Sequence, residues 1–376
     1  MFLSSLLLLA LAVPPVRTIT AFVSVEPTNA EARLVDAAQF LKSARAEFQK
    51  RGLTVQTIRV ATTPMAEFAA SLDDAAALAL LERIDKVAGR EGFALSIGPV
   101  DPKRWKLAAE VIRRTENVNA SLRLTDRDAA QAAAELMRAL STQVPDGSQN
   151  FRFAAIAGLA PGAPFFPGGY ASAAIHHSFA IGAESAAVIR DGLPLLDALR
   201  PMVSAAEAVA KSSGWNYLGL DTSPAPAPDN SIAAALEKRA GAPIGAPGTL
   251  VAAAAITAEL KGLPVKQTGF SGLMLPVLED DVLAQRAAEG RLHLHSLLLY
   301  SAVCGTGLDT VPIPGDTPVA TVAALLEEVA LLAKRWNKPL SARLFLVPGK
   351  KAGDEVKWDR PHLVKSYRVM DPGFAH

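Results

Sequence analysis

Strand-like and helix-like segments alternate regularly after Pro15, which predicts an α/β fold with largely parallel strands. The strand-like segments number about ten, more than an eight-stranded α/β barrel needs. The chain has 376 residues, of which 50% are hydrophobic, so it can bury a large core. We therefore expect residues 16–376 to form one large α/β domain, in which the polar loop 143–149 could separate halves at 16–142 and 150–376.

The periodicity of apolar residues gives the expected order of the elements. Strands are expected at 16–25, 53–61, 94–97, 118–124 and 151–156, with helices between them at 30–51, 73–90, 102–115 and 126–140. Five further strands are expected at 178–183, 217–220, 269–277, 308–313 and 342–347. Helix-compatible segments between successive strands favour parallel pairing.

The N-terminal segment 1–15 is apolar from Phe2 to Val13 except for two serines. It is too short to span a bilayer, so no stable membrane insertion is expected. Three interpretations stay open: the apolar core of an export signal, a short helix that packs on the domain or a neighbouring subunit, and a start codon placed too early. We expect a cytoplasmic homo-oligomer, with export as the alternative.

Composition excludes several classes of function. The 38 basic and 37 acidic residues leave a net charge of +1, so nucleic acid is not an expected partner. The single cysteine excludes an internal disulfide and a cysteine-rich zinc or iron–sulfur site. The sequence has no phosphate-binding loop of the Walker type and no nucleophile elbow, which disfavours nucleotide-dependent and α/β-hydrolase functions.

The loop around Cys304 is rich in glycine and proline and lies between two regular elements. Gly305 and Gly307 permit backbone angles that a Cβ would forbid, so the loop can pass close to a ligand or to another backbone. The turn can also aim the carboxylate of Asp309. A loop that holds one shape is typical of a functional site. The alternative is a tight strand-to-helix connection, in which the cysteine is present only because it is small and apolar.

Acidic side chains follow three of the predicted strands. Glu184 follows 178–183, Asp221 follows 217–220, and Glu279 and Asp280 follow 269–277. The carboxyl ends of parallel strands form the rim where α/β sites are built, so these acids are expected to share one cavity. Two such carboxyl groups can act as acid and base, as in glycosidases. The alternative is that each acid caps the helix after its strand.

The segment 164–179 is rich in aromatic residues and glycine, as pocket-lining loops are. It contributes Tyr170, His176 and His177. Adjacent side chains of a strand point to opposite faces, so one histidine is expected to face the interior. It could donate a hydrogen bond to a substrate hydroxyl or bind a metal beside the acids. The alternative is a surface pair with one packed ring.

Three polar residues on the early predicted strands complete the candidates. Arg17, Arg59 and Asn119 could pair with the acids or bind substrate if their side chains point inward. His293 and His295 alternate with leucines, a pattern more typical of a solvated helix start than of a site.

Several motifs resemble, in order, those of the bacterial and archaeal family called domain of unknown function 711. They are Val16-Arg-Thr-Ile-Thr20, Gly219-Leu-Asp-Thr-Ser-Pro-Ala-Pro226, Ser271-Gly-Leu-Met-Leu-Pro-Val-Leu-Glu-Asp280, Cys304-Gly-Thr-Gly-Leu-Asp309 and Pro314-Gly-Asp-Thr-Pro318. The resemblance runs from about Val16 to about Trp358. It implies a fold similar to pyruvate formate-lyase and other glycyl radical enzymes, in which two parallel five-stranded half-sheets close into a ten-stranded α/β barrel. It implies no activity.

Radical chemistry is not expected despite that resemblance. The C-terminal sequence Arg368-Val-Met-Asp-Pro-Gly373-Phe departs from the loop that carries the radical glycine in those enzymes. Cys304 therefore has no radical source. A similar fold does not by itself carry a mechanism.

The sequence therefore predicts a glycosidase-like hydrolase that acts on a sugar-like small molecule. Glu184 and Asp221 would be the catalytic acid and base or nucleophile. The residues expected to bind the substrate are His176, His177, Tyr170, Glu279, Asp309 and Cys304. The alternative is a non-catalytic binding or regulatory protein with the same barrel. No cofactor is expected, and a divalent metal beside the acids stays open.

Overall fold

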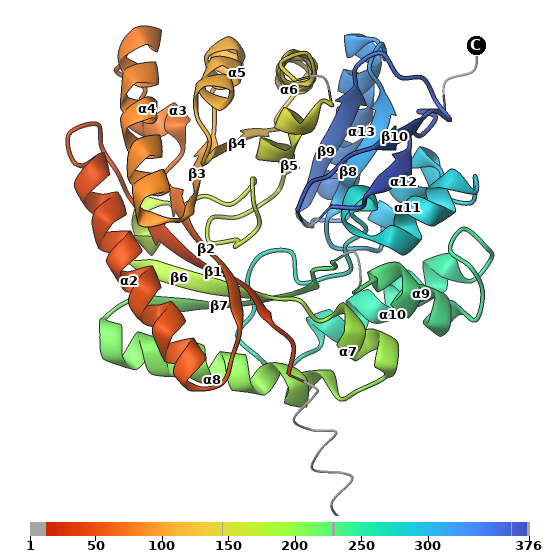
Figure 1. The fold of residues 1–376 in the computed structure, drawn as a ribbon, viewed down its shortest axis with the longest axis horizontal. Helices are drawn as coiled ribbons and strands as arrows, with labels where there is room; N and C mark the ends of the chain where they lie inside the picture. The colour runs from red at the N-terminus through yellow and green to blue at the C-terminus, as the bar shows by residue number, and fades with distance from the viewer. Residues whose placement is uncertain (1–12, 145, 228–229, 362, 374–376) are drawn as a thin grey trace, which may run out of the picture.

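The computed structural model describes residues 13–144, 146–227, 230–361 and 363–373. Most of the apolar N-terminal segment lies outside the described residues, so its three interpretations stay open. The described strands and helices follow the predicted alternation (Figure 1). The strands of the main sheet are β1 Val16–Val23, β2 Val55–Thr62, β3 Ala94–Pro99, β4 Val118–Arg123, β5 Phe153–Ala157, β6 Ser178–Ala183, β7 Asn216–Pro224, β8 Gly307–Pro314 and β9 Leu340–Val347.

A single nine-stranded sheet of mostly parallel strands organises the fold. Its order is β7-β6-β1-β2-β3-β4-β5-β9-β8, and it runs without a break across the loop 143–149, between β4 and β5. Neighbouring strands pair in parallel except at two places, β1 with β6 and β5 with β9. The strands β1 to β5 thus run one way, while β6, β7, β8 and β9 run the other way. The α/β prediction is confirmed at this level.

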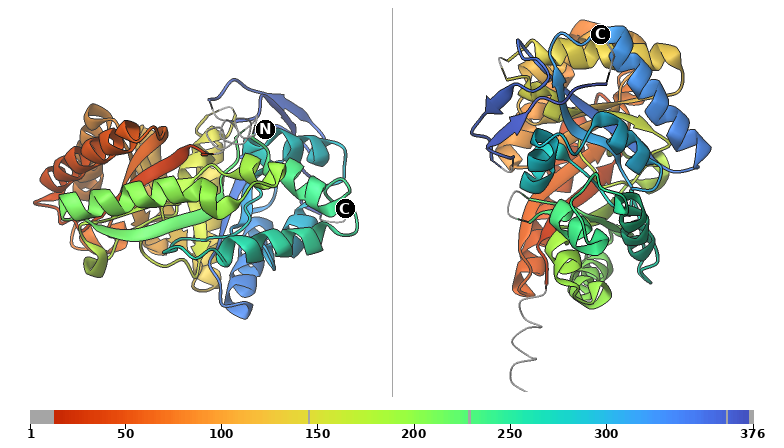
Figure 2. Two further views of the ribbon diagram at one scale, coloured as in Figure 1. Left: turned by 90° about the horizontal axis from the view of Figure 1, so that it is seen from below. Right: turned by 90° about the vertical axis from the view of Figure 1, so that its right-hand side faces the viewer.

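Helices cover one side of the sheet, which is called the outer side below, and the opposite side is called the inward face (Figures 1 and 2). They are α2 Ala30–Lys50, α3 Met65–Phe68, α4 Asp74–Glu91, α5 Trp105–Arg114, α6 Arg127–Ser141, α7 Ala186–Asp191, α8 Leu195–Ser213, α9 Ile232–Ala240, α10 Thr249–Lys261, α11 Asp281–Ala288, α12 Leu294–Ser301 and α13 Val319–Arg335. A small antiparallel hairpin, β10 Glu355–Lys357 with β11 Ser366–Arg368, follows β9. None of these helices, nor any other within the described ranges, has both the length and the apolar character of a membrane span.

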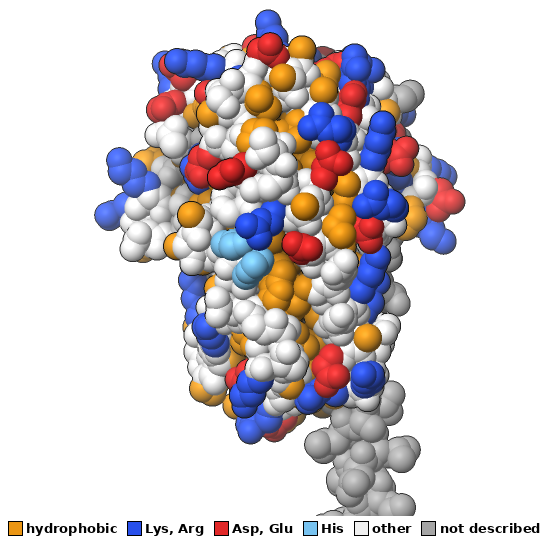
Figure 3. All heavy atoms as spheres, turned by 90° about the vertical axis from the view of Figure 1, so that its left-hand side faces the viewer, with side chains coloured by type: hydrophobic (Ala, Val, Ile, Leu, Met, Phe, Trp, Pro, Cys, Tyr) orange, Lys and Arg blue, Asp and Glu red, His pale blue; other side chains and the backbone are white. Residues whose placement is uncertain are grey.

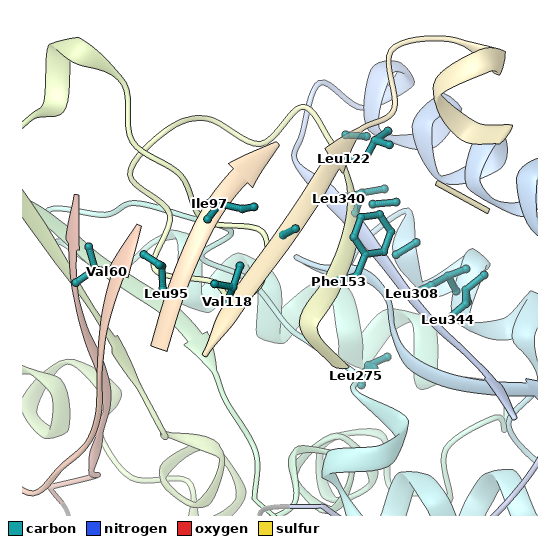
Figure 4. Packing of buried hydrophobic residues seen from close by; sticks show 14 of the residues in the cluster. Val60, Leu95, Ile97, Val118, Leu122, Phe153, Leu275, Leu308, Leu340 and Leu344 are labelled. Carbon is teal, nitrogen blue, oxygen red and sulfur yellow. The ribbon is translucent and has the colours of Figure 1, made fainter. Parts of the chain in front are cut away.

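The main core lies between the sheet and these helices. Figure 4 shows part of it, including Val60 of β2, Leu95 of β3 and Val118 of β4. Side chains of a strand alternate between its two faces, so the opposite face of β2 presents Thr57 and Arg59. The outward face is therefore apolar and covered, while the inward face carries polar groups.

The expected strand at 269–277 is wrong. Within this segment only Pro276 makes an isolated bridge, to Asp309 of β8, and Gln267 just before it bridges to Leu220 of β7. Gly269 and Ser271 both have positive φ, which departs from the backbone angles of a regular strand. The amides of Phe270 and Ser271 donate to a side chain, Asp221, instead of a strand ladder. The segment nevertheless links the two edge strands of the sheet.

The Cys304 loop passes close to that linking segment. A Cβ on Gly305 would overlap the backbone of Gly272, and a Cβ on Gly272 would overlap Gly305. The prediction of a close backbone approach is thus confirmed, and the neighbour is protein backbone. Asp309 lies in β8, two residues after Gly307, which has a φ of +95°.

Candidate functional site

A cavity of about 250 Å³ lies at the inward face of the sheet. Side chains from eight of the nine strands line it, β5 being the exception, together with residues of the segments 164–166 and 274–279. Its charged and amide lining residues are Arg17, Arg59, Asn119, Asp221, Glu279, Asp309 and Arg343. Part of its wall is aromatic, with Phe151, Phe165 and Phe166. The cavity therefore combines several charges with apolar surface, as small-molecule sites do.

Arg343 of β9 holds two acids of the cavity in place. Its Nε donates to Asp309 Oδ1 at 2.5 Å, and its Nη2 donates to Glu279 Oε1 at 2.8 Å. All three side chains are buried. Burial raises the pKa of Asp309, against the attraction of Arg343. Burial lowers the pKa of Arg343, but the two carboxylates outweigh it and raise the pKa above its usual value.

Arg59 of β2 is the arginine of this cavity that has no ion pair with a described carboxylate. Its Nη1 lies 3.5 Å from the carbonyl oxygen of Pro164, and its guanidinium lies 5.1 Å from the ring centre of Phe166. Among the described residues no carboxylate forms an ion pair with it, whereas Arg17 Nη2 lies 3.8 Å from Glu279 Oε2. Burial and the charge of Arg17 lower the pKa of Arg59 to about 9. Glu279 opposes this shift only through its charge, so within the described part of the chain Arg59 has no carboxylate at ion-pair distance.

The polar residues of the early strands meet the condition set for them, since their side chains point inward. Arg17, Arg59 and Asn119 all line the cavity. Arg17 also pairs with one of the acids, Glu279, as the sequence suggested.

Asp221 of β7 lines the same cavity but is held by backbone amides. Its Oδ1 accepts from the amides of Ser223 and Ser271 at 3.0 Å, and its Oδ2 accepts from the amide of Phe270 at 3.1 Å. Burial raises its pKa, while these hydrogen bonds lower it. Asp221 therefore anchors the loop 269–271 as well as facing the cavity.

Glu184 is buried after β6 but is not among the residues that line this cavity. Its carboxylate accepts from Gln56 Nε2 at 2.5 Å and from Asn230 Nδ2 at 3.2 Å. The structure thus brings Asp221 to the cavity and ties Glu184 to neighbouring amides. Their action as a pair stays a prediction.

The neighbours Glu279 and Asp280 have different roles. Glu279 lines the cavity, while Asp280 accepts five hydrogen bonds at the starts of two helices, α9 and α11. The donors are the Ser231 hydroxyl and the amides of Ile232, Ala233, Val282 and Leu283. For Asp280, the helix-capping alternative is therefore the correct one.

The chain matches the family model described as Uncharacterised ACR (DUF711) over residues 12–359. The chain belongs to the DUF711 family. It is 34% identical over 346 residues to a UPF0210 protein of Pyrobaculum arsenaticum, covering 81% of this chain and 76% of that protein. It is 31% identical over 361 residues to a UPF0210 protein of Pyrobaculum aerophilum, covering 84% and 79%. A UPF0210 protein of Neisseria gonorrhoeae is 25% identical over 354 residues, covering 82% and 77%. These names assign no activity.

In this DUF711 protein the two adjacent histidines do not line the central cavity. Their rings stack on each other with centres 3.9 Å apart, and His176 Nδ1 accepts from the amide of Ser24. His177 is exposed beside Trp215. Figure 3 shows histidine side chains at the surface, next to basic and acidic groups. The alternative of a surface pair with one packed ring fits this arrangement.

Tyr170 and Cys304 are also absent from the cavity lining. The Tyr170 hydroxyl donates to the carbonyl oxygen of Leu159 at 2.7 Å, and its ring packs in a buried cluster. Cys304 is buried in the main core, where Lys338 Nζ donates to its carbonyl oxygen. Both side chains have structural contacts that account for their burial. Within the described ranges, no three His, Cys, Asp or Glu side chains are grouped closely enough to hold a metal ion.

Arg343 is the cavity residue that the sequence interpretation missed. It stands in the otherwise uncharged strand Leu340–Val347, and the four residues that follow it are apolar. A charged residue inside a buried strand is unusual unless it is paired, and that was the available signal. The strand itself is predicted from the sequence, at 342–347.

Proposed function

We propose that this protein binds a small anionic molecule in the central cavity. The observation that carries the proposal is Arg59, a cavity arginine for which the described residues provide no carboxylate. Arg17 lies near enough to depress the Arg59 pKa, which adds a second positive charge on the same side. A carboxylate or phosphate would supply the missing negative charge, and a guanidinium can bind either with two parallel hydrogen bonds.

The acids of the cavity form ion pairs with Arg17 and Arg343, and the described residues provide none for Arg59. Glu279 and Asp309 both bond Arg343, and Asp221 accepts three backbone amides. Each carboxylate therefore has partners other than Arg59. The charge on Arg59 is left to a ligand.

Size and access also support a small ligand. The volume of about 250 Å³ lies below the roughly 300–1,000 Å³ of drug-sized pockets. A second hollow of about 540 Å³ shares Arg17, Arg59 and Glu279 with the cavity and adds Arg152 and Arg360. Its arginines would attract an anion toward Arg59.

Calorimetry on the full chain tests this proposal. The probes are gluconate, glycerate and inorganic phosphate, with glucose as the neutral control. At least one anion should bind and glucose should not. Arg59→Gln should weaken that binding by about 10- to 100-fold, because a charge-assisted hydrogen bond is lost. The matched control Arg83→Gln changes an exposed arginine and should bind as the parent does. Equal binding by Arg59→Gln, or binding of glucose alone, would overturn the proposal.

Hydrolysis of a sugar-like molecule is the second candidate. The observation that favours it is Asp221, a cavity acid whose pKa burial raises, as in catalytic acids. Glu184 would be its partner. A panel of chromogenic glycosides and esters tests this, with Glu184→Gln and Asp221→Asn measured beside the parent. Turnover that both variants lose while they remain folded supports the candidate, and fully active variants refute it.

The architecture around the proposed site is the subject of a separate proposal. We propose that the segment 267–276, although it is not a regular strand, takes the place of a tenth strand between β7 and β8, which would close a barrel of two parallel five-stranded half-sheets similar to pyruvate formate-lyase. The support is its pair of parallel bridges to β7 and β8. Amide hydrogen exchange would test this proposal: protection of 267–276 comparable with β7 is expected, and rapid exchange throughout the segment would refute it.

A further inference from the structure

Asp309 has one carboxylate oxygen that the described residues leave without a hydrogen bond. Oδ1 accepts from Arg343, whereas Oδ2 has no partner among the described residues although it is buried. The residue is 0% exposed and lines the central cavity. A buried polar atom without a partner costs free energy, so such an atom beside a cavity points to a ligand.

The surrounding structure fixes this carboxylate. The pairing of β8 with β9 shifts register between Leu308 and Val311, and Thr310 has a φ of +46°. Such a bulge re-aims the neighbouring side chains. Arg343 then holds Oδ1, and the bond between Arg343 and Glu279 restrains the guanidinium from the other side. Oδ2 is therefore held in one place before any ligand binds.

We infer that the ligand carries a hydroxyl group that hydrogen-bonds Asp309 Oδ2, in addition to the anionic group that binds Arg59. The ligand class is thus a hydroxylated carboxylate or phosphate, such as a sugar acid or a sugar phosphate. This inference rests on the proposed anion binding and adds the second recognition element. A hydroxyl both donates and accepts, so it can pair with Oδ2 whether the carboxyl group is ionised or protonated.

The consequence is selectivity against ligands that lack the hydroxyl. A site built to hydrogen-bond a hydroxyl rejects the deoxy analogue strongly, because its own buried group is then left unpaired. Calorimetry with matched probes measures this: gluconate against hexanoate, and glycerate against propionate. For the parent protein we expect the hydroxylated member to bind at least about 10-fold more tightly than its deoxy analogue.

Two variants locate the effect at Asp309. Asp309→Leu should bring the ratio of the two affinities close to one, whereas Asp309→Asn, which keeps a hydrogen-bonding group, should retain part of it. The control Asp280→Asn alters a buried acid that does not line the cavity and should leave the ratio unchanged. If Asp309→Leu does not fold, the ratio for the parent protein decides.

The outcomes separate this inference from the proposal beneath it. Anions that bind through Arg59 with no preference for the hydroxylated member would overturn the hydroxyl contact and leave anion binding intact. A preference that Asp309→Leu fully retains would also overturn it. Failure of every anionic probe to bind would remove anion binding, and the hydroxyl inference with it.

Discussion

Replacing Arg343 with Met should destabilise the protein in a way that depends on pH. The substitution keeps most of the side-chain volume but removes the cation that bonds Asp309 and Glu279. Breaking a buried ion pair typically costs about 3–5 kcal/mol, because a charge is left buried without a partner. Glu279 keeps Arg17 at 3.8 Å, so we expect about 3 kcal/mol, the low end of that range.

The sign of the pH dependence follows from Asp309. Burial already raises the pKa of Asp309 above 3.8, and loss of Arg343 removes the attraction that opposes this rise. When the folded state raises the pKa of an acid, the free energy of unfolding of the protein decreases as the pH rises from the unfolded-state pKa toward the folded-state pKa. The free-energy difference between the variant and the parent should therefore be larger at pH 8 than at pH 5.

Urea denaturation at both pH values measures this difference. Arg83→Met is the control, since Arg83 and Glu31 form a pair in which each side chain is 51% exposed. Such surface pairs contribute about 0–1 kcal/mol. The reasoning is refuted if Arg343→Met costs no more than Arg83→Met, or if its cost is equal at pH 5 and pH 8.

Three further substitutions test other parts of the structure. Gly269→Ala should cost at least about 2 kcal/mol in urea denaturation, because its φ is +69° and its Cβ would overlap the Asp221 carboxylate. The control Gly92→Ala has a similar φ but open space and should cost only about 1–2 kcal/mol, so equal costs would exclude the overlap. Asp280→Ala should cost about 2–4 kcal/mol by the same measurement, because two helix starts lose their acceptor, and a cost below 1 kcal/mol would contradict that role. Cys304→Ser should leave gluconate affinity within about twofold in calorimetry, because Cys304 does not line the cavity, and a large loss with folding preserved would count against this view.

The local pattern of the sequence predicts most of the regular elements. The strand expected at 178–183 is observed as Ser178–Ala183, and the helix expected at 126–140 as Arg127–Ser141. The reason is that apolar periodicity reflects which face of an element is buried. The periodicity wrongly predicts a strand at 269–277. There the amide of Phe270 donates to the side chain of Asp221, which lies 49 residues away along the chain.

The candidate site was predictable only in part. Arg17, Arg59 and Asn119 lie on strands whose inward faces are polar. The alternation of polar and apolar residues along these strands is visible in the sequence. The predicted strand ends also pointed to Asp221 and Glu279, which line the cavity although Asp221 lies inside β7 and no strand precedes Glu279. Whether such an acid faces the cavity or caps a helix is not a local property, as the adjacent Glu279 and Asp280 demonstrate.

The sequence by itself therefore determined most of the strand order, the helices of the first half, the family and the set of polar residues available to the interior. Only the tertiary structure decided which of them meet. Arg343 bonds Glu279 and Asp309, which lie 64 and 34 residues away along the chain, and no described residue bonds Asp309 Oδ2. Such contacts depend on strand register and on a bulge in β8, and these are set by packing between distant segments.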